Sequence, residues 1–500
     1  MKKTIPSLLT ALILAGTLIF SACGGINDDD GAAETAVDET VVGSETADTV
    51  SETEPGEINR ENAKLGLPEL DFGGEVLNLL YVGEEVYRQD IYAEQNGEVV
   101  DDAVYARNMA IEELLNVKLN LICFSNSTND TAAHIGNVVL AGDNLYDLCS
   151  THQSYTTKLV TEGYFHNFAD DEFIGWDNAW WNRDYMLEMG VGESRIYFLL
   201  GDISLMRMKS LACIYYNREM YESLHGRADE PYDLVFNGEW TFDRFSSLVL
   251  DAYSDLNGDS TVNVGDRFGA FGSKSKSVEH FQYACRVTTT TKDSEGIPRL
   301  TLNNERTAEF AEKFHNMYYN NIGFTIAASD KFETDITGFV SGYYLFCPVW
   351  FRHADQLRDM ETDYGIINFP KYEESDEYST LVHNGSTVFV TPITSQQTDK
   401  IGAVCEAMAY YNYVSVTPAY YEVALKVKYS RDDRTSQLLD LISASAYTNF
   451  GYVYSSTIAG MGTMRSFISA NSNNFASWYA AKADAAQAGL DKLVELYLVI

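Results

Sequence analysis

The sequence predicts an α/β protein made of two domains, each assembled from separate stretches of the chain. Three observations support this. From residue 70 onwards, short apolar runs alternate with helical patterns, which is typical of a parallel sheet covered by helices. Strand-like runs return at residues 364–370 and 386–394, after a long middle region of different character. Roughly 440 residues follow the N-terminal segment, enough for two domains of ordinary size.

The folded part begins with a buried-type strand centred on residues 76–82, and a helical pattern follows at residues 101–116. Residues 117–124 then form a second apolar run, residues 131–142 a second helical pattern and residues 146–152 a third apolar run. In open sheets of this kind, ligands bind at the carboxyl ends of the strands.

The later chain contains strand-like runs at residues 195–205 and 210–220. Thr241 is the predicted N-cap of a helix. Further helical patterns lie at residues 305–319, 400–413, 434–444 and 476–499. A chain that crosses back and forth between two domains would produce this order.

Residues 1–22 predict a signal peptide, because two lysines precede an apolar run that ends in small residues. The segment Phe20-Ser21-Ala22-Cys23 resembles a bacterial lipobox, although Phe20 replaces the usual leucine. In a lipobox, Cys23 would be diacylated, for example with palmitate, and two acyl chains hold a protein stably at a membrane. An ordinary secretory signal or an uncleaved anchor are the alternatives.

Residues 23–58 predict an acidic, disordered linker, and residues 59–500 the folded domain. The linker region has 11 acidic residues and no basic ones between residues 26 and 58, so it repels itself and cannot form a core. The whole chain has a net charge of −38. A nucleic-acid partner is therefore excluded, because it would require clustered Lys and Arg.

The cysteines and the missing motifs argue against an enzyme or a redox protein. No CxxC pair, GxSxG, HExxH or P-loop motif occurs. The remaining cysteines favour buried free thiols over disulfides; they are Cys123, Cys149, Cys213, Cys285, Cys347 and Cys405. A pair of glycosidase carboxylates is not excluded, because the chain has 73 acidic residues.

One internal loop predicts a structural calcium ion. Oxygen-bearing side chains stand at loop positions 1, 3, 5, 7, 9 and 12, as in the calcium-loop template, where position 7 contributes its backbone carbonyl. Ser260 replaces the usual turn glycine, and the final residue is Asp rather than Glu, as in dockerin-type loops, which this segment resembles. The predicted ligands are Asp255, Asn257, Asp259, Thr261, Asn263 and Asp266. An Asx-rich turn without metal is the alternative.

Aromatic residues make up 13% of the chain, and several clusters have polar neighbours. Sugars bind proteins by placing their C–H faces on flat aromatic rings, so an aromatic-rich cleft favours a carbohydrate ligand. Packing is the simpler interpretation for Trp176 and Trp240. For Trp350, packing and ligand binding are evenly matched.

An ordered set of short motifs gives the chain its resemblance to a known family. These motifs are DAVYARN at 102–108, EELLNV at 112–117, YD at 146–147, GD at 201–202, YN at 216–217, GEWT at 238–241, FG at 268–269, FVSG at 339–342, DYG at 363–365 and PK at 370–371. With them, the chain from about residue 70 onwards resembles the extracellular solute-binding lipoproteins of ABC importers, of the carbohydrate-type (family 1-like) cluster.

The resemblance implies an α/β, two-lobed periplasmic-binding-protein fold (type II-like) with discontinuous lobes joined by a hinge. It implies no catalytic residue. The strand-end rule and the aromatic pattern predict the ligand-binding residues. They are Glu84, Glu85, His152, Gln153, Trp181, Asp202, Tyr344, Trp350 and Asn384.

The predicted function is capture of an oligosaccharide or related polar solute for import. The receptor would be a monomer, lipid-anchored on the extracellular face of the cytoplasmic membrane of a Gram-positive-type envelope. Its partners would be the solute and ABC permease subunits. The alternatives are an exported glycan-active enzyme, such as a glycosidase or lyase, and a surface adhesion lipoprotein.

Overall fold

The computed structural model describes residues 59–192, 194–327, 330, 333–357, 360–425 and 433–499. The chain divides into two units, residues 1–56 and 57–500, and all described residues belong to the second. The predicted signal peptide, Cys23 and the acidic linker lie outside the described residues.

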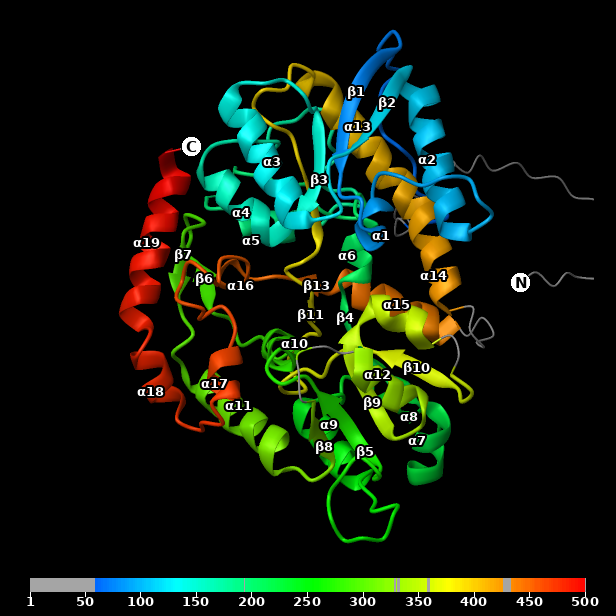
Figure 1. The fold of residues 1–500 in the computed structure, drawn as a ribbon, viewed down its shortest axis with the longest axis vertical. Helices are drawn as coiled ribbons and strands as arrows, with labels where there is room; N and C mark the ends of the chain where they lie inside the picture. Colours follow the sequence, from blue (N-terminus) through cyan, green and yellow to red (C-terminus); the bar gives the residue numbers. More distant parts are fainter. Residues whose placement is uncertain are drawn as a thin grey trace, which may run out of the picture. The chain divides into compact units, whose positions relative to one another are not determined.

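Two sheets organise the described chain, and Figure 1 shows them as separate groups of strands. The first has four strands in the order β12-β3-β1-β2, and the second has five in the order β10-β4-β9-β5-β8. We call each sheet with its helices the first and the second lobe.

The first sheet is formed by strands from two distant parts of the sequence. β1 pairs in parallel with both β2 and β3, whereas β12 is antiparallel to β3. The apolar residues of β1 and β3 are largely buried, as expected for parallel strands that are covered on both faces. The strands are β1 (Glu75–Tyr81), β2 (Val117–Cys123), β3 (Leu148–His152) and β12 (Thr387–Val390).

The second sheet mixes both pairing types. β9 is antiparallel to β4 and parallel to β5, and β4 is also antiparallel to β10. The strands are β4 (Ala212–Asn217), β5 (Phe268–Gly272), β8 (Phe324–Ile326), β9 (Tyr344–Trp350) and β10 (Tyr364–Ile367). Two short pairs complete the set, β6 (Thr290–Lys292) with β7 (Pro298–Leu300) and β11 (Thr380–Leu381) with β13 (Ala446–Tyr447).

Helices of the first lobe begin and end at residues suited to those positions. Ser127 caps α3 through a hydrogen bond from the Asp130 N–H, and Gly142 ends that helix in a left-handed conformation. The helices near the first sheet are α1 (Glu85–Arg88), α2 (Val99–Leu115), α3 (Thr128–Ala141), α4 (Gln153–Thr161), α5 (Arg183–Met189), α6 (Leu205–Lys209), α13 (Thr398–Tyr411), η3 (Asn412–Val416) and α14 (Thr417–Leu425).

Helices of the second lobe follow the same rules. The predicted N-cap Thr241 is confirmed, because its hydroxyl accepts the Arg244 N–H at the start of α9. The indole of Trp240 is fully buried beside it and donates to the carbonyl of Asn368. The helices are α7 (Arg218–His225), α8 (Glu230–Phe236), α9 (Phe242–Asp251), α10 (Ser277–Ala284), α11 (Glu305–His315), η1 (Asn316–Asn320), α12 (Glu333–Val340), η2 (Phe351–Leu357) and α15 (Asp433–Ala444).

The C-terminal segment packs against both lobes. In Figure 1, α19 runs beside β7, and it also contacts α4 of the first lobe. The region predicted as one helix at residues 476–499 contains two helices. The segment comprises α16 (Phe450–Val453), α17 (Arg465–Ser469), α18 (Phe475–Ala480) and α19 (Ala483–Val499).

The strand predicted at residues 195–205 is wrong. Its apolar side chains are buried, but the backbone forms only isolated bridges, one of them between Leu199 and Phe389. The carbonyl of Leu200 accepts the Asn182 N–H, and the Leu200 N–H contacts the Met186 sulfur. Isolated contacts therefore satisfy backbone groups of this run, which forms no continuous ladder of hydrogen bonds with another strand.

Two further sequence expectations concern the chain's chemistry. Within the described ranges, no helix combines the length and apolar character needed to cross a membrane. The six cysteines after Cys23 are free thiols, and five of them are buried, with Cys123 exposed.

Candidate functional site

Trp350 connects the second sheet to the chain that enters the first. It is the last residue of β9 and is only 2% exposed. Its ring centroid lies 4.1 Å from that of His280 on α10 and 4.7 Å from that of His383, which precedes β12. The strand ends of both lobes therefore meet around this indole.

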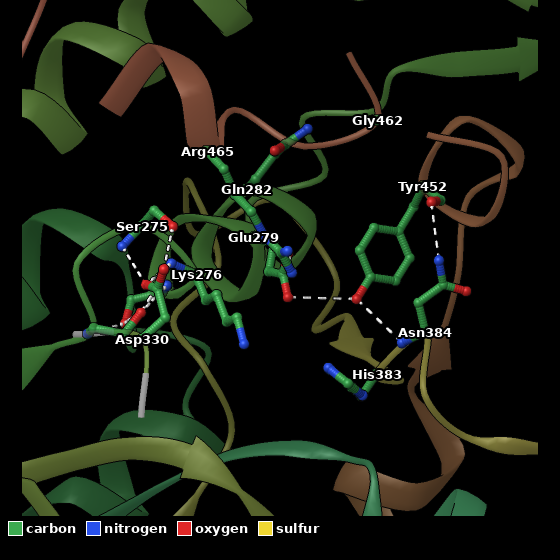
Figure 2. Close-up of polar contacts among 12 residues, drawn as sticks. Ser275, Lys276, Glu279, Gln282, Asp330, His383, Asn384, Tyr452, Gly462 and Arg465 are labelled. Carbon is green, nitrogen blue, oxygen red and sulfur yellow. Dashed lines mark hydrogen bonds and ion pairs between the residues drawn. The ribbon is translucent and has the colours of Figure 1, made fainter. Parts of the chain in front are cut away.

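A chain of hydrogen bonds runs from the end of β3 to α10 and α17, and Figure 2 shows its central part. The Gln153 amide donates to Asn384 Oδ1 over 2.8 Å, and the Asn384 N–H donates to the Tyr452 hydroxyl over 3.2 Å. Tyr452 in turn donates to Glu279 Oε1 over 3.5 Å, and Arg465 Nε donates to Glu279 Oε2 over 2.7 Å. We call these five residues the polar relay.

The polar relay contains a charge in the interior. Glu279 is fully buried. Burial raises its pKa, whereas the neighbouring Arg465 guanidinium acts in the opposite direction. A buried carboxylate of this kind depends on its partner, since removal of one member of a buried ion pair typically costs about 3–5 kcal/mol.

Three histidines contact Trp350, and a fourth, His152, interacts with one of them, His383. We call the four the histidine cluster: His152, His280, His353 and His383. Burial lowers the pKa of His152 to about 4 and that of His353 to about 3. It also lowers the pKa of His280 and His383 well below the ordinary value. These imidazoles are therefore neutral at pH 7.

Aromatic rings of the first lobe border the histidine cluster. The ring centroid of Tyr155 lies 4.6 Å from that of His152, and that of Tyr87 lies 6.1 Å from it. The Tyr87 hydroxyl donates to the carbonyl of Gly385, and burial raises the pKa of Tyr87 to about 12. Tyr155 is 44% exposed, so its ring is available to a solute.

A cavity of about 680 Å³ adjoins this region, between α1 and the start of α2 in the first lobe and η2 in the second. Its lining is mainly polar and charged, with Glu84, Glu85, Val86, Gln89, Glu98, Val100, Asp101, Lys209, Arg352, His353, Asp355, Gln356 and Tyr420. Cavities of this size accommodate small ligands.

The structure brings several of the predicted ligand residues together. His152, Gln153, Trp350 and Asn384 lie in or beside the polar relay and the histidine cluster. Glu84 and Glu85 line the adjoining cavity. Gln153 is fully buried and its amide is engaged by Asn384 and Tyr185, so it orients neighbouring groups.

Three other predicted ligand residues lie elsewhere. Trp181 is 6% exposed, and its indole donates to the Glu406 carboxylate over 2.6 Å. Asp202 faces Arg60 and Arg207 at 3.8 Å and lines a separate cavity of about 630 Å³. The Tyr344 ring packs against Phe268 and Phe271 in the second lobe.

The sequence analysis did not identify several polar and charged residues near the site. His383 stands next to Asn384, and Lys276 follows β5, so the strand-end rule could have found both. The same rule applies to Arg352, two residues after β9, whereas no local signal marks Glu279 or Arg465.

The predicted calcium loop forms a series of turns stabilised by its own side chains. The Asp255 carboxylate accepts the N–H groups of Gly258 and Ser260, and Asp259 accepts that of Thr261. Ser260 has a φ of 60°, the left-handed conformation for which calcium loops ordinarily use glycine.

The last residue of the loop is distinctive. Asp266 is fully buried, with one carboxylate oxygen bonded to Tyr253 and Asn263 and the other without a protein partner. Among the described residues, however, no three His, Cys, Asp or Glu side chains are arranged to hold a metal ion. Calcium binding thus stays a prediction.

No protein-family model and no curated protein matches the sequence. Several solved structures, however, are similar to it in fold. A cyclo/maltodextrin-binding protein complexed with maltotetraose has a TM-score of 0.53 at 12% identity, covering 84% of this chain and 96% of its own. An ABC transporter solute-binding protein from Thermotoga lettingae bound with α-D-tagatose has a TM-score of 0.50 at 12% identity, covering 85% and 100%.

UgpB from Mycobacterium tuberculosis, in complex with glycerophosphocholine, has a TM-score of 0.51 at 14% identity, covering 85% of this chain and 99% of its own. At these identities the likeness establishes the fold. The predicted two-lobed periplasmic-binding-protein fold is confirmed.

The histidine cluster predicts a loss of stability in acid. Between pH 6.5 and pH 4 the unfolded chain protonates His152 while the folded chain does not, so the free energy of unfolding falls as the pH falls. His152→Gln should remove about 2 kcal/mol of this decrease between pH 7 and pH 5. Urea unfolding at both pH values measures the difference, and equal decreases in the wild type and the variant would contradict it.

The calcium loop predicts metal-dependent stability. Calcium should stabilise the wild type by about 1.4 kcal/mol at roughly ten times its dissociation constant, and Asp255→Asn/Asp259→Asn should abolish this effect. Melting temperatures with calcium and with EDTA provide the measurement. Asp170→Asn/Glu172→Gln is the control, because it removes two exposed charges outside the loop. A wild type insensitive to calcium would sink the prediction.

Proposed function

We propose that this protein is a lipid-anchored extracellular receptor of an ABC transporter, and that it captures an oligosaccharide or related polar solute for import. The observation that carries the proposal is the meeting of strand ends from both lobes around Trp350, beside a cavity of about 680 Å³. Ligands of open α/β sheets bind at such strand ends.

The chemistry of the site suits a polar, uncharged surface such as a sugar ring. Tyr155 and Tyr87 offer aromatic faces, and the neutral imidazoles of His152 and His383 offer both donors and acceptors. The cavity adds carboxylates and amides for hydroxyl groups. Sugars are also the named ligands of two proteins of similar fold.

Capture would involve closure of the two lobes around the solute, as in hinge-bending binding proteins. The polar relay supports this idea, because it joins β3 of the first lobe to α10 of the second by directional contacts. The lipid on Cys23 and the acidic linker would keep the receptor close to a membrane permease. The proposed receptor is a monomer.

Solute binding is tested with a panel of oligosaccharides on the protein. At least one should raise the melting temperature, and Tyr155→Ala should weaken that ligand roughly tenfold through loss of aromatic contact. Tyr343→Ala is the matched control, since Tyr343 is 41% exposed and precedes β9 in the second lobe. Small-angle scattering should show compaction with the ligand. The proposal fails if no carbohydrate, polyol or peptide binds.

Lipid anchoring is tested at Cys23. Expressed with its own signal in a Gram-positive host, the wild type should fractionate with membranes and have a mature N-terminus at diacylated Cys23. Cys23→Ala should lose both properties. Mass spectrometry of the N-terminal peptide decides, and an unmodified N-terminus at another residue would refute the anchor.

A further inference from the structure

Lys276 is a cation beside the polar relay, and it has no ion-pair partner among the described residues. It is half-buried between β5 and α10, and its ammonium makes no hydrogen bond or ion pair with any residue in the described part of the chain. Figure 2 shows the side chain extending toward the region between Glu279 and His383. In a chain with 73 acidic and 35 basic residues, such a lysine is unusual.

The two carboxylates close to Lys276 are already engaged. Glu279 accepts hydrogen bonds from Arg465 and Tyr452. Asp330 accepts from the N–H and hydroxyl of Ser275, at 2.7 and 2.9 Å, and from the Lys276 N–H at 3.3 Å. The Lys276 ammonium acts to lower the pKa of both carboxylates, but among the described residues it forms no ion pair with either of them.

His383 provides a second donor on the same side. Its Nδ1 accepts the Gly385 N–H over 3.0 Å, which leaves the ring proton on Nε2. No acceptor for Nε2 is found among the described residues, and the ring is half-buried. Burial is the main cause of the lowered pKa of this imidazole, and the guanidinium groups of Arg352 and Arg465 lower it further.

The positive charge beside Lys276 and His383 is confined to their immediate surroundings. Arg352 lines the cavity together with Glu84 and Asp355, and carboxylates outnumber the cations in that lining. The net charge of −38 repels anions at long range. An anion bound at this site would therefore depend on short, direct contacts with the donors.

This inference rests on the proposed function. We propose that the captured solute carries an anionic group, a carboxylate or a sulfate ester on a sugar, and that the Lys276 ammonium and the Nε2–H of His383 bind it. An ammonium and a neutral imidazole N–H both donate to such an oxygen, and charge-assisted hydrogen bonds are roughly twice as strong as neutral ones. Lobe closure would bury the contact and strengthen it.

The test compares three oligosaccharides of equal length by calorimetry: a uronate-containing, a sulfated and a neutral one. We expect one anionic ligand to bind at least roughly tenfold more tightly than the neutral one. Lys276→Gln should weaken that ligand roughly 10- to 100-fold and leave neutral sugars unchanged. Lys276→Arg should restore most of the affinity, and Lys274→Gln is the control, because Lys274 is exposed two residues away.

The outcomes separate the two proposals. If neutral oligosaccharides bind as tightly as anionic ones, or if Lys276→Gln behaves like Lys274→Gln, the anion proposal is overturned and the receptor function stands. If no oligosaccharide of any charge binds, both are overturned. The uronate and sulfate arms identify the group, and the melting temperature of each variant verifies that it is folded.

Discussion

The buried carboxylate of Glu279 is the constraint on which the site depends. A charge without any solvent contact requires partners, and here Arg465 and Tyr452 supply them from two segments of the C-terminal region. Tyr452 then fixes the backbone of Asn384, which in turn engages Gln153 at the end of β3. One buried charge thus determines how four separate segments meet between the lobes.

The site combines uncharged polar groups with charges of both signs. Neutral histidines, amides and tyrosines surround Trp350, while carboxylates and two cations line the adjoining cavity. Burial makes the imidazoles neutral, so they can donate and accept without adding charge. Such surroundings suit the proposed solute with its many hydroxyl groups, and in the proposed receptor the cations Lys276 and Arg352 would discriminate between solutes by charge.

Local patterns in the sequence predicted much of the fold. Apolar runs located β1, β2 and β3, and Thr241 was predicted correctly as a helix cap because capping involves residues only three positions apart. The same reasoning failed at residues 195–205, where a buried apolar run forms only isolated bridges.

The strand-end rule placed His152, Asn384 and Trp350 near one another, since strand ends are local features. It could not find the partnership of Glu279 and Arg465, which are 186 positions apart and belong to no motif. It also included Asp202, whose surroundings depend on Arg60 and Arg207. Pairings of this kind arise only from tertiary packing.

β12 comes late in the sequence, and this position affects how the protein folds during synthesis. β3 pairs with β12, and Gln153 pairs with Asn384 across 231 positions. During synthesis, β3 cannot pair along this edge until all strands of the second sheet have been translated. The first lobe consequently completes its fold near the end of translation, and long-range pairing of this kind slows folding. The proposed export signal would make use of this delay, because the delay extends the period in which the chain can be threaded across a membrane unfolded.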